Sequence, residues 1–193
     1  MSSKIELIAG LGNPGAKYEG TRHNVGFWFV DQLAHSKGCS LRHESKFQGE
    51  VGKISIDGQT VWLIKPMTFM NLSGQAVSAL ANYYKVPVEN ILAVHDELDL
   101  PPGVLRLKKG GGHGGHNGLR DMIAHFSSKE FMRLRVGIGH PGSSSEVTNY
   151  VLGSPSNDDK QLLLDAIEHS MTVLPQIVAG EYQKAMNHLH SSK

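Results

Sequence analysis

The chain has 193 residues, of which 39% are hydrophobic and 19% charged, and its formal net charge is +1. No apolar run approaches the roughly 20 residues of a membrane span, and the N-terminus lacks a signal-peptide pattern. Cys39 is the only cysteine, which excludes an internal disulfide and suits a reducing compartment. We therefore expect one globular domain over residues 1–193, without membrane contact and located in the cytoplasm.

Strand and helix patterns interleave along the chain. We expect, in chain order, a strand at Ile5–Ala9, a helix at Phe27–His35, a hairpin of strands Gln48–Ile56 and Gln59–Lys65, a helix at Ser73–Tyr84, strands at Ile91–His95 and Val104–Lys108, a helix at Leu119–Phe126, a strand at Met132–Gly139, and helices at Asp158–Ala179 and Glu181–Leu189. Asp57-Gly58 is the turn signal of the hairpin. Asn71 or Ser73 is the expected N-cap of the helix at Ser73–Tyr84.

This order predicts an α/β fold with a twisted mixed sheet flanked by helices. Polar loops follow three of the strands, at Asn13, at Met70-Asn71 and at Asp96. Ligands of such sheets bind beyond the carboxyl ends of strands, so we expect these loops to meet at one rim. Two points stay open: whether Pro175 breaks its helix, and whether Glu146–Pro155 is a lid or a surface turn.

The glycine-rich stretch Gly10–Gly26 admits two interpretations. Gly10, Gly12 and Gly15 spell a dinucleotide-binding motif, but no helix follows Gly15 at once, and Asp31 lies in a helical pattern instead of ending a second strand. An oxidoreductase that binds NAD is therefore disfavoured. In the other interpretation the glycines let the backbone turn sharply, so that Asn13 faces a substrate and the same loop delivers His23.

The motifs of common hydrolytic sites are absent from the sequence or incomplete. The chain has no G-x-S-x-G nucleophile elbow, and Cys39 has no neighbouring base. His113 and His116 could begin a metal site, but nothing nearby in sequence adds a carboxylate or thiolate at ligand spacing, so we expect no metal.

A histidine with a carboxylate partner remains. A neutral, oriented imidazole can act as a general base, and His23 is the candidate, with Asp96, Glu97 or Asp99 as its possible carboxylate. Asparagine amides can both donate to and accept from an acyl group, and four of them stand beside glycines or at the ends of elements: Asn13, Asn24, Asn71 and Asn117. Their ordinary alternatives are turn and cap residues.

A basic strip lies between Pro101 and His140. Only Asp121 and Glu130 oppose seven basic residues there: Arg106, Lys108, Lys109, Arg120, Lys129, Arg133 and Arg135. Such a strip could attract a phosphate backbone, although a solvated face is the simpler explanation from composition alone.

Taken together, these motifs closely resemble the bacterial peptidyl-tRNA hydrolases from Ile5 to about Leu189. The resemblance rests on GLGNPG (10–15), TRHNVG (21–26), KPMTFMNLSG (65–74), HDELDLPPG (95–103), GGGHGGHNG (110–118) and RLRVGIGHPG (133–142). It implies a monomeric α/β enzyme with no cofactor and no obligate protein partner. Its implied reaction is hydrolysis of the ester that joins a peptide to the 3′-terminal adenosine of tRNA.

The resemblance also assigns roles, position by position. It implies that His23 is the general base, that Asp96 orients it, and that Asn13 separates N-blocked peptidyl esters from free aminoacyl esters. It implies further contacts with the substrate, its CCA end or its acceptor stem through Tyr18, Phe69, Met70, Asn71, His116, Asn117, Lys108 and Arg135. Phe69 stands where some relatives carry tyrosine, and the resemblance assigns no role to Lys109. An RNA-binding protein without catalysis is the rival from another class.

Overall fold

The structure is a computed structural model and describes residues 3–191. Its centre is a seven-stranded mixed sheet in the order β2-β3-β4-β1-β5-β7-β6. The strands are β1 (Leu7–Gly10), β2 (Arg42–Glu44), β3 (Gly49–Ile56), β4 (Gln59–Pro66), β5 (Ile91–Glu97), β6 (Leu105–Lys109) and β7 (Met132–Gly137). Strands β4, β1, β5 and β7 run parallel, and the outer pairs are antiparallel. The α/β fold with a mixed sheet is therefore confirmed.

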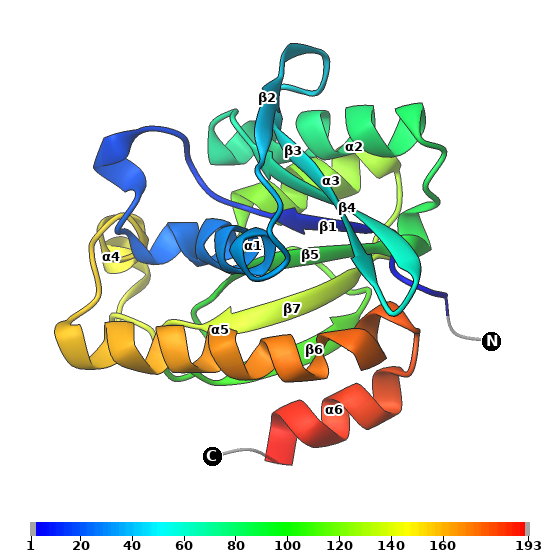
Figure 1. The fold of residues 1–193 in the computed structure, drawn as a ribbon. Coiled ribbons are helices and arrows are strands. Elements are labelled where there is room, and N and C mark those ends of the chain that lie inside the picture. Colours follow the sequence, from blue (N-terminus) through cyan, green and yellow to red (C-terminus); the bar gives the residue numbers. More distant parts are fainter. Residues whose placement is uncertain (1–2, 192–193) are drawn as a thin grey trace.

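Helices cover both faces of the sheet (Figure 1). Helices α1 (Val25–Ser36), α5 (Asn157–Val178) and α6 (Tyr182–Ser191) lie on one face, and α2 (Ser73–Tyr83) and α3 (Asn117–Phe126) lie on the other. Each face buries its own apolar layer, with Phe29 and Leu134 in the first and Leu80 and Phe131 in the second. Because both faces of the sheet are buried, its strands hold the side chains at their ends in fixed positions.

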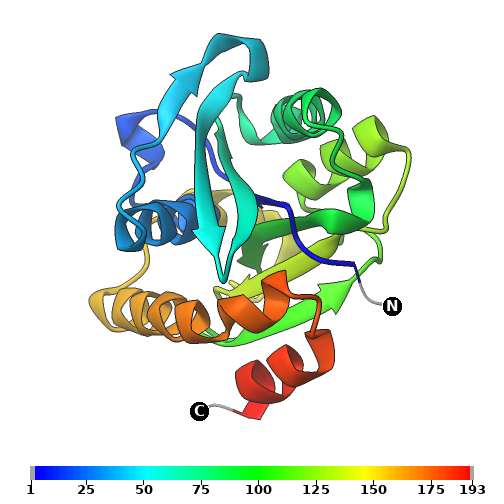
Figure 2. The same cartoon turned by 45° about the vertical axis from the view of Figure 1, so that its right-hand side comes forward.

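The hairpin prediction is confirmed. Asp57 and Gly58 form its turn with φ angles of 48° and 81°, and Ile56 pairs with Gln59 across it. Two successive positive φ angles match the twist of the strands, which explains the Asp-Gly pair. Figure 2 shows the long β3–β4 ribbon in front of the helical layers.

Helix ends differ from the expected ones. Neither Asn71 nor Ser73 caps α2: the preceding residue is Leu72, and the Ser73 hydroxyl donates to the Met70 carbonyl instead. Helix α3 begins two residues earlier than predicted, and the His116 side chain caps it. Helix α5 continues through Pro175 without a break. No helix in the described range is long and apolar enough to cross a membrane.

Short elements escaped the pattern analysis. They are β2, the helix α4 (Val147–Val151), and six 3-10 helices: η1 (Ala16–Tyr18), η2 (Arg22–Asn24), η3 (Ser45–Phe47), η4 (Met70–Leu72), η5 (Val88–Asn90) and η6 (Ser144–Glu146). Three to five residues are too few for a helical period to appear in sequence. The segment Glu146–Pro155, for which the sequence left a lid or a surface turn as alternatives, therefore contains α4.

Candidate active site

Two glycines bring the start of α1 against the ends of β1 and β5. A Cβ at Gly10 would lie 2.2 Å from the Gly26 carbonyl oxygen, and a Cβ at Gly26 would lie 2.4 Å from the Val94 carbonyl oxygen. Only Gly15 of the first three glycines has a positive φ, of 106°. The expectation that all three make sharp turns is therefore wrong, because Gly10 serves close approach. The contact places η2, which carries His23, beside β5, which carries Asp96.

His23 and Asp96 meet inside this junction. The Nδ1 atom of His23 lies 2.9 Å from one carboxylate oxygen of Asp96 and 3.0 Å from the other. Asp96 was one of three candidate carboxylates, and it is the one that contacts His23; Glu97 binds Arg135 instead. With its Nδ1–H donated to the carboxylate, His23 keeps the lone pair on Nε2, on a ring that lines a cleft.

His116 approaches the same carboxylate from the opposite loop. Its Nε2 lies 2.8 Å from Asp96 Oδ1, while its Nδ1 accepts the backbone N–H groups of Gly118 and Leu119 at 3.1 and 3.2 Å. An atom that accepts two N–H groups carries no proton, so the ring proton of His116 is on Nε2 and points at Asp96. Asp96 therefore receives one N–H from each histidine.

Electrostatics follow from these bonds. Burial would raise the pKa of Asp96, but His23 and His116 hold it far below its ordinary range. Burial alone would lower the pKa of His23, but the charge and hydrogen bond of Asp96 raise it above the ordinary 6.5. Behind them, burial and the neighbouring His116 lower the pKa of His95 to about 4, so His95 is neutral. The site thus holds a fixed carboxylate and a histidine that can take a proton near neutral pH.

The same three side chains could suggest a metal. One ligand atom each of His23, Asp96 and His116 lie within 4.8 Å of one another, so a carboxylate does stand near His116, contrary to the expectation from sequence spacing. A metal on Nε2 of His116 would displace its proton while two N–H groups still face Nδ1, leaving the ring without any proton. The donor set fits a hydrogen-bonded cluster better than a metal site.

Asn13 is held by a second asparagine. The Asn13 backbone N–H donates to Asn24 Oδ1 at 2.8 Å, and Asn24 Nδ2 donates to the Asn13 carbonyl at 2.9 Å. Asn13 Oδ1 accepts the backbone N–H of Met70 at 2.6 Å. Its oxygen is therefore engaged, and its Nδ2 is the group left to face a ligand. Asn24 is one of the four asparagines singled out from the sequence, but its hydrogen bonds to Asn13 were not expected.

A cleft of about 590 Å³ opens over these groups. It is lined by eight of the residues singled out from sequence: Asn13, His23, Phe69, Met70, Asn71, Asp96, His116 and Asn117. Tyr18 is not in its lining, but its ring meets Phe69 edge-on at 6.5 Å between centroids. The expected meeting of these residues at one rim is thus confirmed, but Asp96 lies within β5 and not in a loop after it.

Helix α4 forms part of the cleft wall, through Val147, Thr148 and Val151. Arg22 fastens it: the guanidinium lies 3.9 Å from the Tyr150 ring centroid, and Nη1 donates to the Tyr150 carbonyl at 2.9 Å. The Arg22 backbone N–H also donates to Gly153. Arg22 therefore holds α4 in place at the cleft wall. The sequence did not predict this role, because a helix of five residues shows no helical periodicity.

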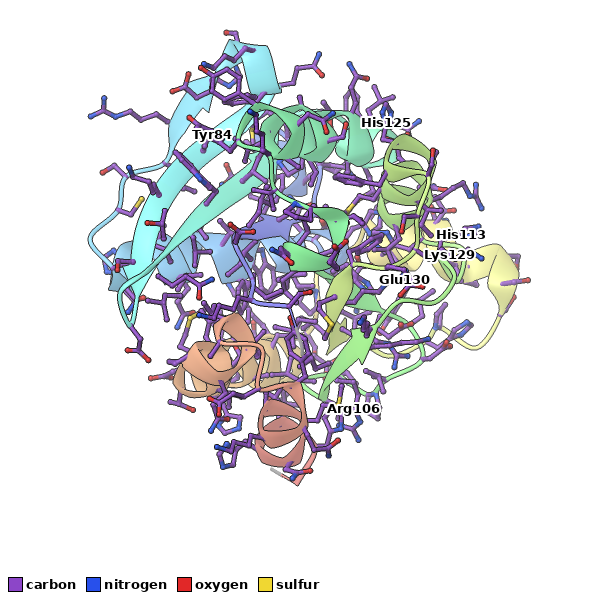
Figure 3. The ribbon with its side chains drawn as sticks, turned by 90° about the vertical axis from the view of Figure 1, so that its right-hand side faces the viewer. Tyr84, Arg106, His113, His125, Lys129 and Glu130 are labelled. Carbon is purple, nitrogen blue, oxygen red and sulfur yellow. The ribbon has the colours of Figure 1, made fainter. Side chains whose placement is uncertain are left out.

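The basic strip includes residues of the edge strand β6 and of β7, which pairs with the site strand β5, and its members differ in exposure. Lys108 and Lys109, on β6, are exposed, whereas Arg133 is buried and donates to the carbonyls of Gly111, Gly112 and Lys129. Arg135 Nε lies 2.9 Å from a Glu97 carboxylate oxygen. Figure 3 shows Arg106, His113 and Lys129 along one side of the molecule, with Tyr84 on the other. Neither Lys108 nor Arg135 lines the cleft.

Comparisons with known proteins identify the family of this chain. The family model described as peptidyl-tRNA hydrolase matches residues 7–193. The peptidyl-tRNA hydrolase of Methylobacillus flagellatus is 56% identical over 187 residues, covering 97% of each chain, and that of Coxiella burnetii is 54% identical over 191 residues, covering 99% of this chain and all of the relative. A crystal structure of the Acinetobacter baumannii enzyme superposes with a TM-score of 0.96 at 49% identity, covering 100% of this chain and 98% of the other. The chain therefore belongs to the peptidyl-tRNA hydrolase family.

Proposed function

We propose that this protein hydrolyses the ester between the peptide and the 3′-terminal adenosine of peptidyl-tRNA, with His23 as general base and Asp96 as its orienting group. The observation that carries the proposal is the 2.9 Å contact between His23 Nδ1 and the Asp96 carboxylate, made in a cleft lined by Asn13, Asn71 and Asn117. The family membership supplies the reaction, and this geometry supplies a base.

The proposed reaction needs only water and the ester. His23 Nε2 takes a proton as the water oxygen attacks the acyl carbon, and Asp96 stabilises the imidazolium that results. The tetrahedral intermediate then collapses: the bond from carbon to the 3′ oxygen breaks, and that oxygen receives the proton from His23. General-base help of this kind contributes about 10²–10⁴ in rate, and positioning contributes further.

The asparagines hold the substrate in this scheme. Asn13 Nδ2 is the donor that remains after its oxygen binds Met70, so we assign it to an acyl or peptide carbonyl of the N-blocked substrate. We assign Asn71 and Asn117, with His116, to groups near the scissile bond and the CCA end. Phe69 is exposed and meets Tyr18 edge-on, and the largely buried Met70 lines the cleft. We assign these three side chains to apolar contacts with the substrate.

Recognition of tRNA is the electrostatic part of the proposal. Lys108 and Arg135 would contact phosphates of the acceptor stem, and the other exposed members of the basic strip would add attraction. Phosphate and shape recognition suits an enzyme that must accept many tRNA sequences. We infer further that the protein works as a monomer, because one chain contributes every group that the scheme uses. We place it in the cytoplasm because its single cysteine suits a reducing compartment.

Single-turnover cleavage of an N-acetylaminoacyl-tRNA tests the proposal. We expect His23→Ala to lower the rate constant about 10²–10⁴-fold. The matched control is His125→Ala, which removes an exposed histidine on α3, and its rate should stay within about twofold of wild type. A His23→Ala rate near that of wild type would refute the base assignment, and RNA binding without ester turnover by the wild type would favour the non-catalytic rival.

The role of Asn13 has its own test. Wild type should cleave the N-acetylated substrate far faster than the free aminoacyl-tRNA, and Asn13→Ala should reduce that ratio by lowering the first rate about 10–10²-fold. Asn13→Asp keeps the acceptor for Met70 but lacks the Nδ2 donor, so it should lose discrimination as well. An unchanged ratio in both variants would show that discrimination lies elsewhere.

A further inference from the structure

Asp96 is shared between two histidines, and the proposed proton transfer uses only His23. The rings of His23 and His116 both contact the carboxylate, and their centroids are 5.1 Å apart. His116 Nε2 makes the shorter contact, 2.8 Å to Oδ1. The backbone N–H groups of Gly118 and Leu119 hold His116 in the one tautomer that donates to Asp96. The second N–H is therefore a built feature of the site.

We propose that His116 is a positioning residue that divides the Asp96 carboxylate between two imidazoles and thereby sets the lower pH limit at which His23 can act as a base. The inference rests on the proposed role of His23. A carboxylate that accepts one hydrogen bond would favour the protonated form of His23 more strongly than one whose charge is shared with a second donor. A protonated His23 cannot accept a proton from water, so the second donor keeps the base available at lower pH.

Besides the exposed Asp99, whose backbone N–H binds Glu97, the other titratable groups that line the cleft have hydrogen-bond partners other than His23. His95 donates to the Asp96 backbone carbonyl, Glu97 accepts from Arg135 and from the Asp99 N–H, and His113 and His140 each accept a backbone N–H from a residue two positions on. From α4, Tyr150 faces Arg22 and donates to the Ile138 carbonyl. Within residues 3–191, Asp96 is the group that hydrogen-bonds the His23 side chain. The pKa of His23 should therefore depend on whether Asp96 also accepts the N–H of His116.

Two substitutions of His116 separate its two hydrogen-bonding functions. His116→Asn places an amide oxygen where Nδ1 caps α3 but is too short to donate to Asp96. His116→Gln places an amide N–H near the Nε2 position but gives up the cap. The pair therefore tests the Asp96 donor and the helix cap independently, in the same position of the fold.

The measurement is kcat against pH for N-acetylaminoacyl-tRNA, corrected for uncatalysed hydrolysis. In wild type the acid limb should fall above pH 6.5, because the pKa of His23 is raised. His116→Asn should move this limb upward, lowering kcat about three- to tenfold at pH 6 and by less than about twofold at pH 8. His116→Gln should keep the wild-type limb while its Tm falls about 2–4 °C.

Histidine proton NMR of the free enzyme gives a readout that does not depend on activity. The His23 signal, assigned by its absence in His23→Ala, should titrate at higher pH in His116→Asn than in wild type or in the control His113→Asn. An unmoved His23 titration and an unmoved acid limb in His116→Asn would overturn the inference, as would a loss of kcat that is equal at pH 6 and pH 8. Full activity of His23→Ala would instead defeat the proposed function itself.

Discussion

The hydrogen-bonded cluster of His23, Asp96 and His116 is organised differently from the basic strip, which includes residues of β6 and β7. In the cluster, backbone and side-chain partners determine which nitrogen carries each proton. In the strip, the exposed Lys108 and Lys109 supply charge on flexible side chains. Proton transfer depends on atomic positions, whereas attraction to a phosphate backbone depends mainly on charge. The contrast predicts that small changes damage the cluster severely and the strip gradually.

The largest effect is expected from a change that keeps the shape of the cluster. Asp96→Asn is nearly isosteric, but an amide N–H facing His23 Nδ1 would force the proton onto Nε2, the atom that must accept one from water. We expect kcat to fall about 10³–10⁴-fold with KM changed little. Single-turnover kinetics with near-UV circular dichroism would check this. A fall of less than tenfold in a correctly folded variant would show that orientation by Asp96 matters little.

An intermediate effect is expected from Asn24, whose side chain hydrogen-bonds the Asn13 main chain. Asn24→Ala removes both hydrogen bonds to the Asn13 main chain, so the Asn13 amide should shift relative to the base. We expect kcat to fall about 10–10²-fold with little change in KM. Asn149→Ala, at an exposed position on α4, is the matched control and should behave as wild type. A rise in KM alone would indicate a binding role instead.

Within the strip the effects should be smaller and should differ between two residues. Lys108→Ala should raise KM for tRNA substrates several-fold and lower the slope of log KM against log salt by about 1. Arg135→Ala should do the same more weakly, because the Glu97 carboxylate already offsets its charge. Neither should change kcat/KM for a short ester without the acceptor stem. Equal losses on both substrates would assign these residues to folding or chemistry.

The smallest effect is expected from metal removal. If the cluster is held by protons, as the His116 tautomer indicates, a chelator selective for transition metals should leave hydrolysis of a short ester within about twofold of the untreated rate. Metal analysis of the dialysed protein is the complementary measurement. A stoichiometric transition metal whose removal abolishes activity would contradict the assignment of protons.

The order of the strands in the sequence was enough to predict that three of the residues meet at the site. Loops that follow parallel strands emerge at the same edge of a sheet, so Asn13, Asn71 and Asp96 could be placed together from the sequence. The Asp57-Gly58 hairpin was equally accessible, because its turn needs two positive φ angles. Both predictions rest on local rules that need no knowledge of side-chain packing.

The contact between His116 and Asp96 could not be predicted in this way. The loop before His116 includes four glycines with positive φ, Gly110, Gly111, Gly114 and Gly115. Glycine in such conformations can follow many paths, so residue spacing along this loop carries no information about where His116 points. The grip of Asn24 on Asn13 was hidden for a similar reason, because it depends on how closely α1 approaches β1.

That approach has a consequence for how the enzyme tolerates change. His23 can lie close to Asp96 because Gly10 and Gly26 have no side chains, which lets α1 pack directly against the sheet. An alanine at either position would act as a wedge between α1 and the sheet and would separate base from carboxylate without altering a reactive atom. A random mutagenesis screen for lost hydrolysis should therefore recover these two buried glycines alongside the histidine, although neither meets the substrate.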